Sequence, residues 1–123
     1  MQHVPWDGKA KETYQKEGLK MVVYVAHAYG GRPENVERAK EVTRSLQLKH
    51  LDHCFVCPLL VFSNLKYGEI GRAQEMELCL DLLSVCDCLL IASEISEGVQ
   101  AEIDFAKKIG VEVVELAKNR RDI

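Results

Sequence analysis

The sequence has no apolar run long enough to cross a membrane and nothing that resembles a secretory signal or a transit peptide. A spanning helix needs about 20 apolar residues, so we expect no contact with a membrane and a cytoplasmic protein. An excess of positive charge is also missing, because 16 lysine and arginine residues stand against 19 aspartate and glutamate residues. This balance gives no general attraction to polyanions. We therefore expect no nucleic-acid polymer as a partner.

Five cysteines give an odd count, and four of them lie in apolar segments, which favours buried, reduced thiols over disulfides. Cys54 and Cys57 form a Cys-x-x-Cys pair with two apolar residues between them. That pattern is typical of a buried strand, whereas the redox motif uses a helix N-terminus. A zinc site would need two further ligands, and His50 and His53 are too close in sequence for the usual spacing. We expect neither a metal nor a cofactor.

With 123 residues, 47% of them hydrophobic, the chain has material for one core and too little for a second domain of ordinary size. Residues 1–19 are polar without a sustained period, and residues 118–123 are polar as well. The sequence therefore predicts an N-terminal extension over 1–19, a folded domain over 20–117 and a short tail over 118–123.

Short apolar runs alternate with segments of helical period along this domain. Runs rich in β-branched residues predict strands, and apolar residues three and four apart predict helices. The predicted strands cover 21–26, 54–58, 88–92 and 111–116, and the predicted helices cover 33–48, 71–85 and a third segment from Val99 to Ile109 that Gly110 closes. The chain after Pro58 is expected to be a loop as far as Gly71.

This alternation predicts a single-domain α/β fold of the Rossmann or flavodoxin kind. Right-handed crossovers give a parallel sheet, here with expected order 2-1-3-4, flanked by helices. In such sheets ligands bind beyond the carboxyl ends of the strands, near the point where the strand order reverses. The rule selects the loops after Ala26, Pro58 and Ala92 as the place for a small-molecule site.

The first of these loops combines two flexible glycines with an aromatic ring, an imidazole and a guanidinium. Its candidate binding residues are His27, Tyr29, Gly30, Gly31 and Arg32. The glycines permit close approach of a ligand to the backbone. They could equally serve only the turn, and their spacing matches neither a dinucleotide fingerprint nor a Walker A loop.

The loop after the third strand leads into a helix whose first turn is expected to carry Glu102, and Asp87 opens the preceding strand. Two carboxylates that converge on one cleft can serve as a nucleophile and an acid/base group. An acidic residue in the first turn of a helix is also favoured by the helix dipole alone, which is the structural alternative for Glu102.

These features carry a resemblance to a known family. The matching segments are Val23-Tyr24-Val25-Ala26, Gly30-Gly31, Cys86-Asp87 and, above all, Ser96-Glu97-Gly98-Val99-Gln100-Ala101-Glu102. They are similar to the nucleoside 2-deoxyribosyltransferase superfamily, closest to its small, poorly characterised bacterial and phage branch. The similarity covers roughly residues 20 to 116.

The resemblance implies cleavage of an N-glycosidic bond. Glu102 matches the nucleophile that attacks the anomeric carbon, Tyr24 matches a tyrosine that orients it, and Asp87 lies near an aspartate that acts on the base. Ser96 stands where relatives that hydrolyse nucleoside monophosphates carry serine. Gly98 belongs to the same motif. The resemblance therefore favours a phosphorylated ligand, with Gly30, Gly31, Arg32 and Ser96 as candidate phosphate contacts.

Three readings of the function follow. The first is an N-glycosidase or deoxyribosyltransferase acting on a nucleoside or its 5′-monophosphate. The second is a protein of the same fold that binds a nucleotide or nucleotide signal without turnover, and the third is an α/β interaction domain. Departures from the superfamily at His27, Ala28 and Leu59 keep the second reading open. The helix over 71–85 is apolar on more than one face, so we also expect a homodimer or larger homo-oligomer.

Overall fold

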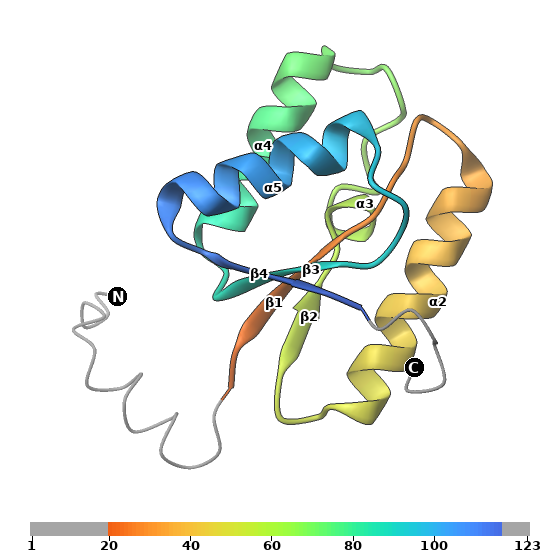
Figure 1. The fold of residues 1–123 in the computed structure, drawn as a ribbon. Helices are drawn as coiled ribbons and strands as arrows, with labels where there is room; N and C mark the ends of the chain where they lie inside the picture. The colour runs from red at the N-terminus through yellow and green to blue at the C-terminus, as the bar shows by residue number, and fades with distance from the viewer. Residues whose placement is uncertain (1–19, 117–123) are drawn as a thin grey trace, which may run out of the picture.

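The computed structural model of the protein describes residues 20–116, so the expected extension and tail lie outside the described residues. Four strands and four helices follow one another along this part of the chain (Figure 1). They are β1 (Val22–Ala26), α2 (Pro33–Lys49), β2 (Cys54–Val56), α3 (Pro58–Val61), α4 (Arg72–Ser84), β3 (Cys88–Ile91), α5 (Glu97–Ile109) and β4 (Glu112–Glu115). Within residues 20–116, no helix combines the length and the apolarity of a membrane span.

The strands form one parallel sheet in the order β2-β1-β3-β4, which confirms the predicted fold class and order. Tyr24 in β1 lies opposite Val56 in β2 and Leu89 in β3. Along the chain, β2 is added on one side of β1, and β3 is then added on the other side of β1. The strand order therefore reverses between β1 and β3, where their carboxyl ends can border a ligand.

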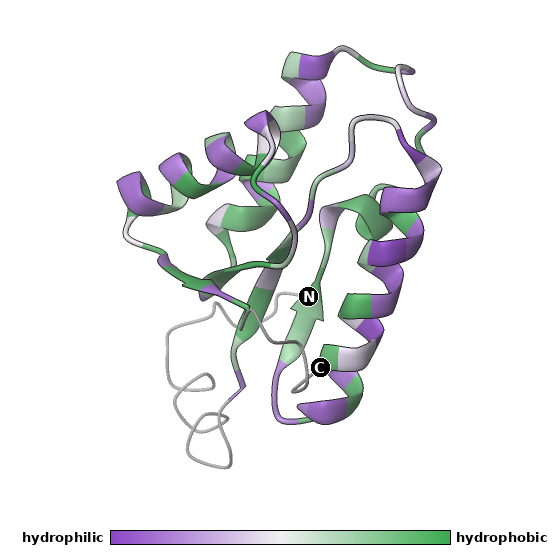
Figure 2. Cartoon of the chain, turned by 45° about the vertical axis from the view of Figure 1, so that its right-hand side comes forward, coloured by the Kyte–Doolittle hydropathy of each residue, from purple (hydrophilic) through white to green (hydrophobic). Residues whose placement is uncertain are grey.

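Helices cover both faces of the sheet, α4 and α5 on one and α2 and α3 on the other (Figure 1). Side chains alternate along β1, so that Tyr24 and Ala26 pack under α4 and α5, whereas Val23 and Val25 face α2 and α3. The hydrophobic colour gathers on the strands and on the inner sides of the helices, with hydrophilic residues outward on α2 and α5 (Figure 2). Burial of these faces holds the three layers together.

Local signals in the sequence explain where the helices begin and end. Pro33 occupies the first turn of α2, where its missing N–H costs no hydrogen bond. Ser96 caps α5, since its Oγ accepts a hydrogen bond of 3.2 Å from the Val99 amide. Gly110 ends α5 in a left-handed conformation with φ of 83°.

The chain after the second strand differs from the expectation. The predicted loop after Pro58 contains the short helix α3, because Pro58 ends the strand and also suits the first position of a helix. The amides of Leu60 and Val61 both donate to the Cys57 carbonyl at 2.9 Å. Cys57 is buried as predicted, but Cys54 is exposed, because β2 is an edge strand of the described sheet.

Candidate active site

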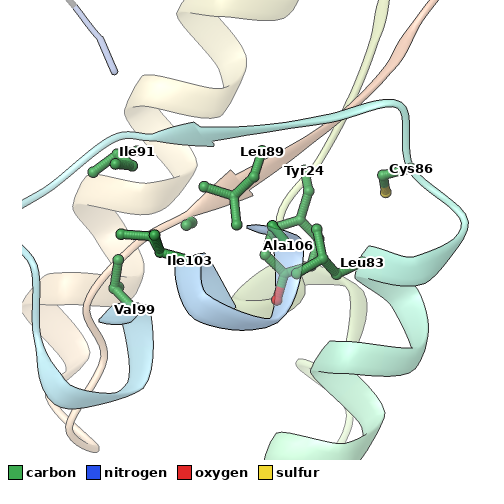
Figure 3. Packing of buried hydrophobic residues seen from close by; sticks show 9 residues of the cluster. Tyr24, Leu83, Cys86, Leu89, Ile91, Val99, Ile103 and Ala106 are labelled. Carbon is green, nitrogen blue, oxygen red and sulfur yellow. The ribbon is translucent and has the colours of Figure 1, made fainter. Parts of the chain in front are cut away.

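A buried pair of side chains joins the centre of the sheet to α5. Tyr24 has none of its surface exposed, and its hydroxyl donates a hydrogen bond to Oε2 of Glu102. Figure 3 shows Tyr24 reaching from β1 between Leu83 of α4 and Ala106 of α5. Glu97, and not Glu102, is the acidic residue in the first turn of α5. The dipole explanation therefore applies to Glu97 and leaves Glu102 unexplained.

Burial controls the ionisation of both partners. Glu102 is 6% exposed, and desolvation raises the pKa of its carboxyl group to about 7, while the hydrogen bond from Tyr24 acts in the opposite direction. Burial and the neighbouring Glu102 charge raise the pKa of Tyr24 well above its ordinary value. Tyr24 is thus a permanent neutral donor, and Glu102 stands between acid and carboxylate at neutral pH.

The two oxygens of Glu102 have different surroundings. Oε2 is held by Tyr24, whereas Oε1 receives no hydrogen bond from any residue of the described range 20–116. Glu102 also lines a cavity of about 420 Å³, within the roughly 300–1,000 Å³ usual for small-molecule sites. The geometry leaves one positioned carboxylate oxygen available to a ligand.

The cavity lies where the topology predicted a ligand, beside the loops that follow β1 and β3 and under the start of α4. Six of the candidate site residues from the sequence line it. They are His27, Tyr29, Gly30, Ser96, Gly98 and Glu102. The loops after β1 and β3 are joined beside it, because the Ala28 amide donates to Ser93 Oγ at 2.8 Å.

His27 is held in one orientation at the end of β1. Its side chain is buried, with 7% of the residue exposed. The ring nitrogen Nδ1 lies 2.8 Å from the Ala28 carbonyl oxygen. A carbonyl can only accept, so Nδ1 carries the hydrogen, and Nε2 is the nitrogen left to exchange a proton or bind a ligand.

Two tyrosines form an aromatic wall of the cavity. The rings of Tyr29 and Tyr67 meet edge to face, with centroids 5.4 Å apart and planes at 83°. Gly31 makes this contact possible, since a Cβ atom there would lie 2.7 Å from the Tyr67 ring, and its φ of 72° also disfavours other residues. Gly31 therefore supports the wall and does not itself line the cavity.

Two candidate residues lie elsewhere. Asp87 sits at the amino ends of the strands, where its Oδ2 accepts from the Val22 amide at 2.7 Å. This is the opposite edge of the sheet from the cavity, so Asp87 and Glu102 do not share a cleft. Arg32 is exposed outside the cavity, and its Nε donates to Glu34 at 3.2 Å.

The start of α4 supplies cavity residues that sequence reasoning missed. Arg72, Glu75 and Cys79 line the cavity together with Glu97 of α5. Arg72, Glu75 and Cys79 recur at helical spacing, a signal that was obscured because α4 has apolar residues on several sides. The pKa of the Cys79 thiol is raised to about 11 by burial and by the Glu102 charge. No cluster of three potential metal ligands occurs within residues 20–116.

A comparison with models of protein families places the domain in one family. A family model described as Domain of unknown function (DUF7768) matches residues 21–116. The match covers most of the chain and coincides with the described domain. A comparison with the curated proteins gave no match.

Proposed function

We propose that this chain, which belongs to the family described as Domain of unknown function (DUF7768), cleaves the N-glycosidic bond of a nucleoside with Glu102 as the nucleophile. One observation carries the proposal. A buried glutamate lines a cavity of suitable size, with one oxygen fixed by Tyr24 and the other without a hydrogen bond from the described residues. A glutamate in this arrangement is suited to attack a carbon atom held beside it.

The chemistry follows from the charge that develops on the sugar. As the bond from C1′ to the base nitrogen breaks, its electron pair leaves with the base and the sugar gains oxocarbenium character. A carboxylate beside C1′ stabilises that charge, and Oε1 of Glu102 then forms a bond to C1′. Attack of water on C1′ releases the sugar, and attack by another base completes a transfer. Two displacements leave the configuration at C1′ unchanged.

Tyr24 contributes by keeping Oε2 in place and by lowering the pKa of Glu102 against the effect of burial. The sequence resemblance supports the same roles, since Ser96, Gly98 and Glu102 match the superfamily's motif and Tyr24 its orienting tyrosine. The link from this family to the nucleoside 2-deoxyribosyltransferase superfamily is part of the proposal.

The charge of the cavity favours a nucleoside over its monophosphate. Glu75, Glu97 and Glu102 line it against the single guanidinium of Arg72. Two of the expected phosphate contacts are absent from it, since Arg32 pairs with Glu34 and Gly31 packs under Tyr67. A phosphate dianion would meet more negative than positive side chains. We therefore propose an uncharged nucleoside as the preferred ligand.

Nucleotide or nucleoside binding without turnover is the second candidate. The observation that favours it is the pKa of Glu102, which burial raises to about 7. A pKa raised in this way favours the neutral carboxyl group, which cannot attack C1′ but can donate a hydrogen bond. Such a group would hold a ligand without reacting with it.

The test is an assay of base release. The purified protein is incubated with nucleosides and their 5′-monophosphates, each with and without a free acceptor base, and the released base is separated by chromatography. We expect Glu102→Ala to reduce release by roughly a thousandfold or more, and Glu41→Gln, an exposed glutamate on α2, to leave it unchanged.

Each result separates the candidates. Release by the wild type that persists in Glu102→Ala would exclude Glu102 as the nucleophile. If no nucleoside is cleaved while the same compounds raise the melting temperature, the binding candidate replaces the enzyme. Faster release from monophosphates than from nucleosides would contradict the preference drawn from the cavity charge.

The compartment and the assembly are proposals as well. Five free cysteines fit the reducing cytoplasm. On α4, Leu78 lines the cavity and Leu82 packs on the core. Val85, which follows the last residue of α4, is 73% exposed. The expected homo-oligomer would cover Val85, and size-exclusion chromatography with light scattering measures whether one forms.

A further inference from the structure

We infer that His27 is the acid that protonates the departing base, an inference that rests on the proposed function. In the first half of the reaction His27 starts as the imidazolium, with a hydrogen on each ring nitrogen. It gives the Nε2 proton to a ring nitrogen of the base, which leaves the neutral ring with Nδ1–H on the Ala28 carbonyl. The bond from C1′ to the base breaks, its electrons remain on the base, and Oε1 of Glu102 bonds to C1′. In the second half water attacks C1′, its proton passes to Nε2, and the Glu102 carboxylate leaves.

The setting of His27 suits a group that must carry a proton to a fixed point. Its side chain is buried at the cavity wall, and Nδ1–H is committed to the Ala28 carbonyl at 2.8 Å. The Ala28 amide is itself bound to Ser93 Oγ at 2.8 Å, which ties the loop after β1 to the loop after β3. Nε2 receives no hydrogen bond from the described residues. The imidazole is therefore oriented, with one nitrogen free for exchange.

Apart from His27 and the nucleophile Glu102, no titratable side chain that lines the described cavity is both buried and held in one orientation. Glu97 and Arg72 are exposed, and a guanidinium does not give up its proton in proteins. Glu75 is half-buried in the first turn of α4, and no residue between 20 and 116 holds its carboxylate with a hydrogen bond. Asp87, the acid that the sequence suggested, lies at the opposite edge of the sheet.

The experiment uses bases that differ in their need for a proton. Guanosine needs protonation to lose its base, whereas 7-methylguanosine already carries a positive charge on the base and releases it without a proton. For an enzyme that prefers pyrimidines, uridine and 5-nitrouridine form the corresponding pair, because 5-nitrouracil leaves readily as an anion. Ribosides and 2′-deoxyribosides of each base are tested.

The variants separate proton transfer from hydrogen bonding. His27→Asn places an amide nitrogen near Nδ1, which keeps the bond to Ala28 and removes Nε2. His27→Gln places a donor near Nε2 that cannot transfer a proton. We expect both variants to lose about a hundredfold in rate on the demanding base and less than about threefold on the activated one. His50→Asn, at an exposed site outside the cavity, is the matched control and should keep the wild-type rate on both.

Three results would overturn the inference. An equal loss on both bases, with an unchanged melting temperature, would make His27 a binding residue. A leaving-group-dependent loss in Glu75→Gln that His27→Asn does not show would assign the acid to α4. If the wild type cleaves neither base of either pair, the proposed function falls and the inference falls with it, an outcome distinct from the first two.

Discussion

The two faces of the sheet bury different chemistry. Under α4 and α5 the apolar cluster includes Tyr24, whose hydroxyl meets a carboxyl group beside a cavity. Under α2 and α3 the buried sheet positions are apolar. The only buried side-chain oxygen or nitrogen without a hydrogen bond in the described residues is Oγ1 of Thr43, near the Cys57 thiol. One face of the sheet therefore presents a partnered, ionisable group to a cavity, and the other buries a hydroxyl beside a thiol.

The largest expected difference between the faces is the pH dependence that Glu102 imposes on stability. Its pKa rises from 4.5 in the unfolded chain to about 7 in the folded protein. The contribution of the neutral Glu102 side chain to the free energy of unfolding is fully present below pH 4.5, and it is lost as the pH rises through 7. The glutamine of Glu102→Gln cannot ionise. The free energy of unfolding of this variant should therefore exceed that of the wild type by roughly 3 kcal/mol at pH 8.5, with little such gain at pH 4.5.

Urea unfolding at several pH values measures this difference. Glu41→Gln on the surface of α2 is the control and should track the wild type at every pH. Parallel stability curves for Glu102→Gln and the wild type would mean that the Glu102 carboxyl group is solvated in the folded protein.

The next effect concerns the partner of Glu102 on the same face. Tyr24→Phe removes the donor to Oε2, so we expect a loss of about 1–2 kcal/mol in the free energy of unfolding. The pKa of Glu102 should rise further, because the lost hydrogen bond lowers it. The acidic limb of the pH profile of base release should then move to higher pH. Tyr67→Phe, at an exposed ring, should not change stability, and an unmoved limb in Tyr24→Phe would count against the orienting role.

The smallest effect is expected on the opposite face. Thr43→Val replaces a buried hydroxyl without a hydrogen bond by a methyl group of the same shape. The change should be neutral or stabilising by less than about 1 kcal/mol, measured by thermal unfolding. A loss of stability above that value would show that the Thr43 hydroxyl forms a hydrogen bond with the Cys57 thiol. This face of the sheet would then contain a buried polar interaction as well.

The fold followed from local signals that agreed with one another. Short β-branched runs, Pro33 at a helix start and Gly110 at a helix end each specify a boundary without knowledge of the tertiary structure. Pro58 is an ambiguous signal, because proline is found both at the end of a strand and at the start of a helix. Only the packing of Leu59 and Leu60 under β1 decides between a loop and α3.

The site was less accessible from the sequence. The motif placed Tyr24 and Glu102 as partners, and the structure brings them together. Asp87 was expected to share a cleft with Glu102, but it precedes β3 and therefore lies at the amino end of that strand, away from the cavity. The order of the predicted elements already contained this information. Arg72 and Glu75 depend on how α4 is rotated over the cavity, and its apolar residues on several sides do not fix that rotation.

The strand β4, at one edge of the described sheet, affects whether two copies of the protein can pair their sheets at high concentration. It begins at Glu112 and ends at Glu115, both exposed, with Val113 between them packed toward α5. An edge strand offers unpaired backbone groups to any passing strand, and charged residues on it oppose such pairing. Two copies that tried to join their sheets along β4 would bring four carboxylates together. The charges at Glu112 and Glu115 thereby oppose growth of the described sheet past β4.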